Sequence, residues 1–150
     1  MRGIVANERV IAGRSDEALK PYEQAAASLE TLMGQDRANA DWQAELSSVK
    51  LRWAQALRVR DPERARALYQ EGLALATELV EKDRTNVVWS LMLVDALSTP
   101  IGIDEADQDR QRRRALAIVT DLQSRNALPR TWRDGSSGLA QSLAGPGAGR

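Results

Sequence analysis

The 150-residue chain carries 21 Lys and Arg residues against 21 Asp and Glu residues, so its formal net charge is zero. No overall field therefore draws it toward nucleic acid or an anionic membrane surface. The sequence contains no Cys and no His, which excludes disulfides, thiolate chemistry and the commonest general base and transition-metal ligand. Zinc, haem and Ser-His-Asp sites are thus excluded, and we expect no cofactor.

The N-terminal region shows neither a secretion signal nor a membrane span. Its longest apolar stretches, around Ile4 and Val10, cover only a few residues. We therefore expect a cytoplasmic protein that does not associate with a membrane. The preference for Arg over Lys, together with abundant Ala, is typical of a bacterial sequence.

An internal repeat organises the chain. Residues 36–42 (DRANADW) recur as residues 83–89 (DRTNVVW), which share Asp, Arg, Asn and Trp at an offset of 89 − 42 = 47 residues. The same offset relates four further pairs: Ala18 and Ala65, Tyr22 and Tyr69, Ala27 and Ala74, Leu32 and Leu79. A degraded third copy follows at an offset of 118 − 75 = 43 residues, which pairs Leu75 with Ile118, Leu79 with Leu122 and Trp89 with Trp132. Terminal repeats are commonly atypical in this way.

The apolar spacing within each unit is helical. One stripe steps by three or four residues through a helix over residues 40–58: Trp42, Leu46, Val49, Trp53 and Leu57. Leu51 lies roughly opposite this stripe, so we expect the helix to be buried on two sides. A second helix starts at Asp61-Pro62, with the Asp as N-cap, and Gly72 allows a neighbour to approach it closely.

The turn between units has its own chemistry. Asn39 and Asn86 are good N-cap residues whose side-chain oxygens can accept from the amides near Trp42 and Trp89. Each Trp is expected to anchor its helix on the preceding one. Three Trp residues share one repeat position and Trp53 lies on the Trp42 stripe, so we favour core packing over stacking platforms for bases or sugars.

The first unit is expected to be partial. Carried backward, the 47-residue offset places Met1 opposite Ser48, so the chain would begin inside a first helix, followed by a second helix over residues 15–33. The missing half would leave apolar surface exposed near Tyr22, Ala26 and Leu29. An upstream repeat or a second copy of the chain would then cover that edge.

Helix pairs with Ala and Tyr at fixed places, closed by Asp-x-x-Asn before the next helix, resemble the tetratricopeptide repeat family over residues 15–132. The unit is 47 residues long rather than 34, which also fits the HEAT and armadillo range. The resemblance implies an all-α fold of antiparallel helix hairpins, stacked as a short right-handed α-solenoid. We expect this repeat domain to span residues 1–132, with a full unit at about 40–86, and residues 133–150 to form a flexible tail rich in Gly, Ser and Ala.

Residues 104–114 (DEADQDRQRRR) combine acidic residues with an Arg run. A metal loop, a nucleic-acid patch and an Arg contact for an acidic partner are alternatives. We favour a solvated helix, because acidic residues suit a first turn and Asp109 and Arg113 have the spacing of an ion pair. A calcium loop would need a central Gly and a terminal Glu, which are absent.

The family resemblance implies that one face of the repeats binds a peptide or helix of a partner protein. The candidate groove residues flank the apolar stripe of the 40–58 helix: Glu45, Ser48, Arg52 and Gln55 on one side, Gln43 and Lys50 on the other. We therefore predict a non-catalytic protein-interaction module with no nucleic-acid partner. The alternative is a C-terminal self-assembly or regulatory segment of a larger signalling protein. An enzyme is disfavoured, because no nucleophile, base or Gly-rich loop accompanies pairs such as Lys20 and Glu23.

Overall fold

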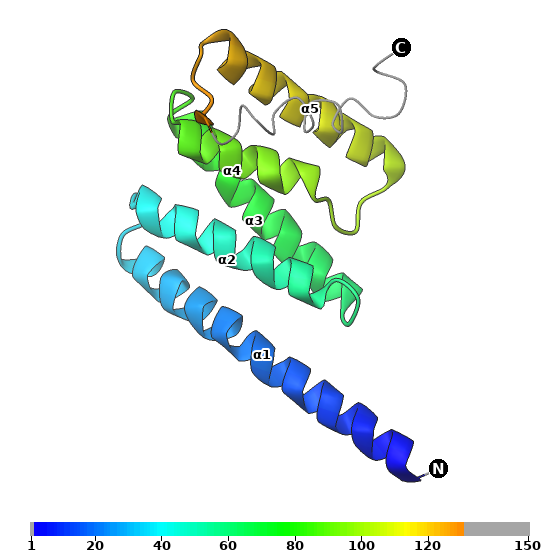
Figure 1. Cartoon of the computed structure of the whole chain (residues 1–150). Coiled ribbons are helices and arrows are strands. Elements are labelled where there is room, and N and C mark those ends of the chain that lie inside the picture. The colour runs from blue at the N-terminus through cyan, green and yellow to red at the C-terminus, as the bar shows by residue number, and fades with distance from the viewer. Residues whose placement is uncertain (1, 131–150) are drawn as a thin grey trace.

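The computed structural model describes residues 2–130, with side chains from Glu17 onward, and this part of the chain contains helices and no strands (Figure 1). Five helices follow one another: α1 (Arg2–Gln35), α2 (Ala40–Leu57), α3 (Pro62–Lys82), α4 (Val87–Ser98) and α5 (Glu105–Ser124). The predicted all-α class is confirmed. The predicted tail over residues 133–150 and the third repeat Trp, Trp132, lie outside the described residues.

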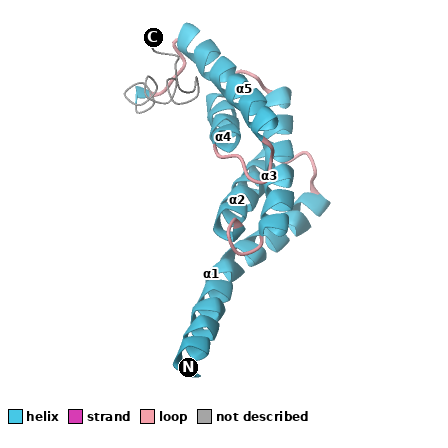
Figure 2. Cartoon of the chain, turned by 90° about the vertical axis from the view of Figure 1, so that its right-hand side faces the viewer, coloured by secondary structure: helices cyan, strands magenta, loops and turns pink. Residues whose placement is uncertain are grey.

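Each helix packs on the next one in the chain, and α2 also touches α4. In Figure 1 successive helices run in opposite directions, so that the chain builds outward from α1 at one end to α5 at the other. In Figure 2 the N-terminal half of α1 projects beyond the other helices. The packed part of the molecule is therefore built from contacts between neighbours in sequence.

The predicted break within the first unit is wrong, because α1 is one continuous helix from Arg2 to Gln35. The physical reason lies in the connection. The positions that the 47-residue offset aligns with Asp61 and Pro62 are held by Arg14 and Ser15, so the N-cap and proline that start a new helix are missing. The proline of this region, Pro21, lies inside the helix.

The repeated turn has the predicted geometry in both copies. The Asn39 side chain accepts a hydrogen bond from the Trp42 amide at 3.2 Å, and Asn86 accepts from the Trp89 amide at 3.0 Å. The Asp that opens each turn accepts from the amide two residues on, Ala38 in the first copy and Thr85 in the second. The Asp-x-x-Asn signature is therefore a capped helix connection, and Asp61 caps α3 in the same way.

The α2–α3 pair is the closest helix contact. Ser47 donates a hydrogen bond to the carbonyl oxygen of Gly72 at 2.7 Å, inside the interface. A Cβ atom on Gly72 would lie 2.8 Å from Leu51 Cγ and 3.2 Å from the Ser47 carbonyl oxygen. The predicted close approach at Gly72 is confirmed, and Leu51 belongs to it.

Two apolar clusters follow from this stacking. The first joins α1, α2 and α3 around Leu46, Trp53 and Leu68, and the second joins α3, α4 and α5 around Ala76, Leu93 and Val119. Tyr69 connects α3 to the next pair, since its hydroxyl oxygen lies 2.9 Å from the Ala96 carbonyl oxygen and 2.8 Å from the Gln111 side-chain oxygen. Its single hydrogen can be donated to either of them. Burial raises the pKa of Tyr69 to about 12, against the hydrogen bond to Gln111, so the phenol is neutral at physiological pH.

The Trp residues divide between two roles. Trp53 is buried in the first cluster as predicted, with the Arg64 guanidinium 4.7 Å from the centre of its ring system. Trp42 and Trp89 are only partly buried and belong to neither cluster of the described residues. The prediction that they are core anchors is therefore wrong. Each sits in the first turn of its helix.

The predicted exposed edge near Tyr22, Ala26 and Leu29 is also wrong. Ala26 is buried in the first cluster, and Tyr22 and Leu29 pack against it. These residues lie on the side of α1 that faces α2, because the helical spacing of 22, 26 and 29 forms one stripe. The side chains proposed to need an upstream repeat are thus already in contact with the core.

The Gly72 contact predicts a specific destabilisation. Gly72→Ala should cost about 1–3 kcal/mol, because the new methyl group forces α2 and α3 apart, although Ala is the better helix former by about 1 kcal/mol. Gly34→Ala is the matched control, since a Cβ atom there meets nothing within 4 Å. In urea titrations the control should be neutral or stabilising, and equal stability of the two variants would contradict the close contact.

Candidate functional site

Two of the six predicted groove residues are engaged in the interior of the structure. Gln43 and Lys50 are buried, with 1% and 9% of their surface exposed, and both bind neighbouring helices. Their role as partner contacts stays a prediction, and their solvent-facing placement is wrong. The sequence pattern placed them beside the apolar stripe, where a polar side chain usually faces solvent. In this chain α1 and α3 cover that flank of α2.

Gln43 joins α2 to the C-terminal half of α3. Its amide nitrogen donates to the Leu75 carbonyl oxygen at 3.2 Å and to the Glu78 carboxylate at 3.1 Å, while its oxygen accepts from Lys82 at 2.9 Å. Both amide hydrogens and the amide oxygen are therefore engaged, as a buried amide requires. The side chain fills the space between the two helices.

Lys50 joins α1, α2 and α3. Its ammonium group lies 3.0 Å from the Glu30 carboxylate and 2.7 Å from the Glu71 carboxylate. Burial alone would lower the pKa of Lys50, but the hydrogen bonds and charges of Glu71 and Glu30 outweigh it, so the net shift is upward. The lysine is accordingly charged at neutral pH. With Glu30 and Glu71 it forms two ion pairs that join three helices, and we call this group the three-helix ion pair.

The other four candidates remain accessible on one side of α2. Glu45, Arg52 and Gln55 are exposed and Ser48 is partly buried. Two contacts place them beside α4: the Ser48 hydroxyl lies 3.6 Å from the Met92 sulfur, and Gln55 donates to the Thr99 carbonyl oxygen at 3.3 Å. We call this surface the α2–α4 face, and define it by Glu45, Ser48, Arg52, Gln55, Met92 and Asp95. The structure thus brings four of the predicted residues together.

The acidic and basic run forms the first half of α5. Asp104 caps this helix by accepting from the Asp107 amide at 2.8 Å, so the predicted acidic helix start is confirmed. The predicted Asp109–Arg113 ion pair is wrong, since Asp109 binds Arg112 at 2.9 Å, three residues on. Asp107 similarly binds Arg110 at 3.3 Å. No cluster of acidic residues suited to a metal ion exists among the described residues.

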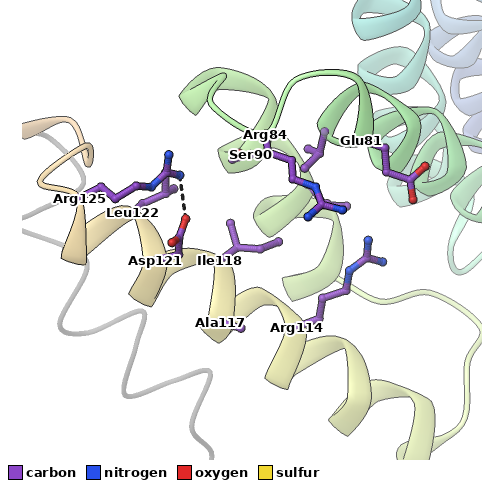
Figure 3. Close-up of a pocket in the computed structure, with 11 residues that line it drawn as sticks. Glu81, Arg84, Ser90, Arg114, Ala117, Ile118, Asp121, Leu122 and Arg125 are labelled. Carbon is purple, nitrogen blue, oxygen red and sulfur yellow. Dashed lines mark ion pairs between the residues drawn. The ribbon is translucent and has the colours of Figure 1, made fainter.

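A cavity of about 340 Å³ opens between the end of α3, α4 and α5 (Figure 3). We call it the α3–α5 cavity. Its apolar wall comes from Val80, Leu93, Ile118 and Leu122, and its charged residues are Glu81, Arg84, Arg114, Asp121 and Arg125. Arg125 binds Asp121 at 2.7 Å. Figure 3 shows Arg84 and Arg114 reaching toward the same space from opposite sides.

Two other hollows lie near α1. One, of about 340 Å³, is lined by Glu30, Lys50 and Glu71, which form the three-helix ion pair, and by Glu23 and Arg64. The other, of about 420 Å³, lies by Trp53 and Arg64. In the α3–α5 cavity, Arg84 and Arg114 make no ion pair among the described side chains, residues 17–130.

The sequence did contain a signal for this cavity. The 43-residue offset aligns Glu78 with Asp121 and Lys82 with Arg125, and the 47-residue offset aligns Gln43 with Ser90. Combined, the two offsets show that a long amide side chain in one unit is replaced by a short hydroxyl in the next. The structure shows that positions 43 and 90 are both buried, so the shorter side chain at position 90 leaves a cavity.

Comparisons with family models, with curated proteins and with solved structures each return no match for this chain. The resemblance to tetratricopeptide repeats therefore remains a prediction from the repeat pattern. None of the helices that the structure describes combines the length and apolar content that crossing a bilayer requires. The functional assignment accordingly rests on the α2–α4 face and the α3–α5 cavity.

The different surroundings of two glutamines in α2 give a matched test. Gln43→Ala should cost about 1–3 kcal/mol, because it removes the three partly buried hydrogen bonds of a buried side chain and leaves Lys82 and Glu78 without this partner. Gln55→Ala removes one exposed hydrogen bond and should change stability by less than about 0.5 kcal/mol. Denaturant unfolding of both variants measures these changes. If Gln43→Ala destabilises the protein no more than Gln55→Ala does, the hydrogen bonds of Gln43 do not contribute to stability as described.

Proposed function

We propose that this protein is a non-catalytic interaction module of tetratricopeptide-like type, which binds a peptide or helix of a partner protein on the α2–α4 face. The proposal includes the stacking of helix hairpins as a short right-handed solenoid. It is supported by the repeated capped turns, which hold the first helix of each pair, α2 and α4, in equivalent places. The observation that carries it is the cluster of accessible polar side chains along that pair.

The side chains of the α2–α4 face suit recognition of another chain. Glu45, Arg52 and Asp95 are exposed and make no ion pair with the side chains described for residues 17–130, so each charge is available to a partner. Met92 is partly buried at the centre and supplies adaptable apolar contact. A polar rim around an apolar contact is the usual composition of a protein interface.

The helical spacing aligns these groups. Positions 45, 48, 52 and 55 of α2 recur at three- and four-residue steps, and Met92, Asp95 and Thr99 do the same on α4. The two rows lie side by side because Ser48 meets Met92 and Gln55 meets Thr99. A bound helix or extended segment could contact both rows at once.

Charge reversal tests the assignment. A partner can be captured and identified with a photo-cross-linking amino acid in place of Gln55. Arg52→Glu should then weaken its binding by about tenfold, because a contact charge becomes repulsive. Arg113→Glu, an equally exposed arginine on α5, is the control and should change the affinity by less than about twofold. Titration calorimetry measures both.

The reverse pattern, with loss only in Arg113→Glu, would contradict binding on the α2–α4 face. Light scattering on the same samples separates the other reading. If the chain self-associates and Arg52→Glu makes it monomeric, the face serves self-assembly rather than recognition of a different protein.

A further inference from the structure

The α3–α5 cavity occupies a place that is filled in the preceding repeat. Gln43 lies between α2 and α3 and binds Leu75, Glu78 and Lys82 there. The repeat offsets align these four residues with Ser90, Ile118, Asp121 and Arg125, all of which line the cavity. The hollow exists because the Ser90 side chain is too short to reach the residues that align with the partners of Gln43.

The serine at this position has a largely buried side chain whose hydroxyl is open to the cavity. Ser90 is only 3% exposed and lines the cavity. Its hydroxyl makes no hydrogen bond within the described part of the chain. Among the described residues no fully buried side-chain oxygen or nitrogen lacks a hydrogen-bond partner, so the Ser90 hydroxyl oxygen is open to the cavity. A polar group of a ligand can therefore reach it there.

The charges at the mouth of the cavity are asymmetric. Asp121 is occupied by Arg125 at 2.7 Å. Arg84, in the turn before α4, and Arg114, on α5, are exposed, without ion-pair partners among the side chains described for residues 17–130, and directed toward the same space (Figure 3). Glu81, which also lines the cavity, carries the opposite charge. Two converging guanidinium groups fit a carboxylate, which accepts paired N–H donors.

We propose that the α3–α5 cavity binds an acidic segment of a partner protein, in which a Glu or Asp carboxylate sits between Arg84 and Arg114 and a neighbouring apolar side chain enters the cavity. The apolar side chain packs on Leu93 and Ile118, and the Ser90 hydroxyl donates to a carbonyl oxygen of the segment. The proposal shares with the proposed function only the class of partner. It uses different residues, so either can fail without the other.

The test uses the full chain, isotopically labelled for NMR, and a blocked hexapeptide, acetyl-Gly-Gly-Leu-Glu-Gly-Gly-amide. Saturable shifts of the Ser90 and Ile118 amides are expected, with a Kd on the order of 1 mM. The Leu-Gln and Ala-Glu versions should bind at least about fivefold more weakly, because each lacks one of the two contacts. Added salt should weaken the Leu-Glu peptide.

Variants assign the binding to the cavity. Arg114→Gln should weaken the Leu-Glu peptide by about fivefold, whereas Arg113→Gln, its exposed neighbour, should leave the affinity unchanged. Glu81→Gln should strengthen binding by about twofold, because it removes an opposing charge. Ser90→Gln should abolish binding by filling the cavity as Gln43 does in the first unit. If Ser90→Gln does not fold, the exposed Arg114 and Arg113 variants still decide the question.

Three results would overturn the proposal: absence of saturable shifts at about 10 mM peptide, equal affinity for the Leu-Glu and Leu-Gln peptides, or equal effects of Arg113→Gln and Arg114→Gln. A peptide that ends in Leu with a free C-terminal carboxylate tests whether a chain terminus is the ligand instead. Binding of that peptide without binding of Leu-Glu would overturn the side-chain carboxylate as the ligand and place a chain terminus in the cavity instead.

Discussion

The close contact between α2 and α3 is the constraint on which the rest of the structure depends. Gly72 lets the Ser47 hydroxyl reach its carbonyl oxygen at 2.7 Å, and Leu51 closes over the same point. Two polar links flank this point on α2: Gln43, which binds the end of α3, and Lys50, which binds Glu71 on α3 and Glu30 on α1. Side chains on one helix pair thus set the positions of α1 and α3, and Tyr69 on α3 extends the frame to α4 and α5.

The two helix pairs share one arrangement but differ in how the space between their helices is filled. Between α2 and α3 the space beside the frame is filled by a hydrogen-bonded amide, which contributes to stability. Between α4 and α5 the equivalent residue is Ser90, and the space is open. The surrounding charges change with it, from Glu71 in the first pair to Arg114 at the aligned position of the second. The residues shared by the two repeats therefore determine the helix arrangement, and the residues that differ between them form the candidate binding cavity.

The repeated elements were predictable from the sequence, because short-range chemistry decides them. The Asn caps, the Asp61-Pro62 start and the small residue at Gly72 all lie where the pattern placed them. Features that depend on which neighbouring helix covers a given helix face could not be predicted from the sequence. The pattern made Gln43 and Lys50 solvent-facing although α1 and α3 cover them, and it made Trp42 and Trp89 buried although they lie at helix starts. The missing Asp-Pro pair at positions 14 and 15 could have revealed the continuous α1.

Native-state hydrogen exchange of the full chain tests the central role of the α2–α3 contact most directly. Amides that open only by global unfolding report the part of the structure on which everything else depends. The amides around Ser47 and Leu51 in α2 and around Gly72 in α3 should exchange most slowly, with a shared free energy of opening. If the slowest amides instead lie in α4 and α5 while those of α2 and α3 exchange through local opening, the central role of the α2–α3 contact is contradicted.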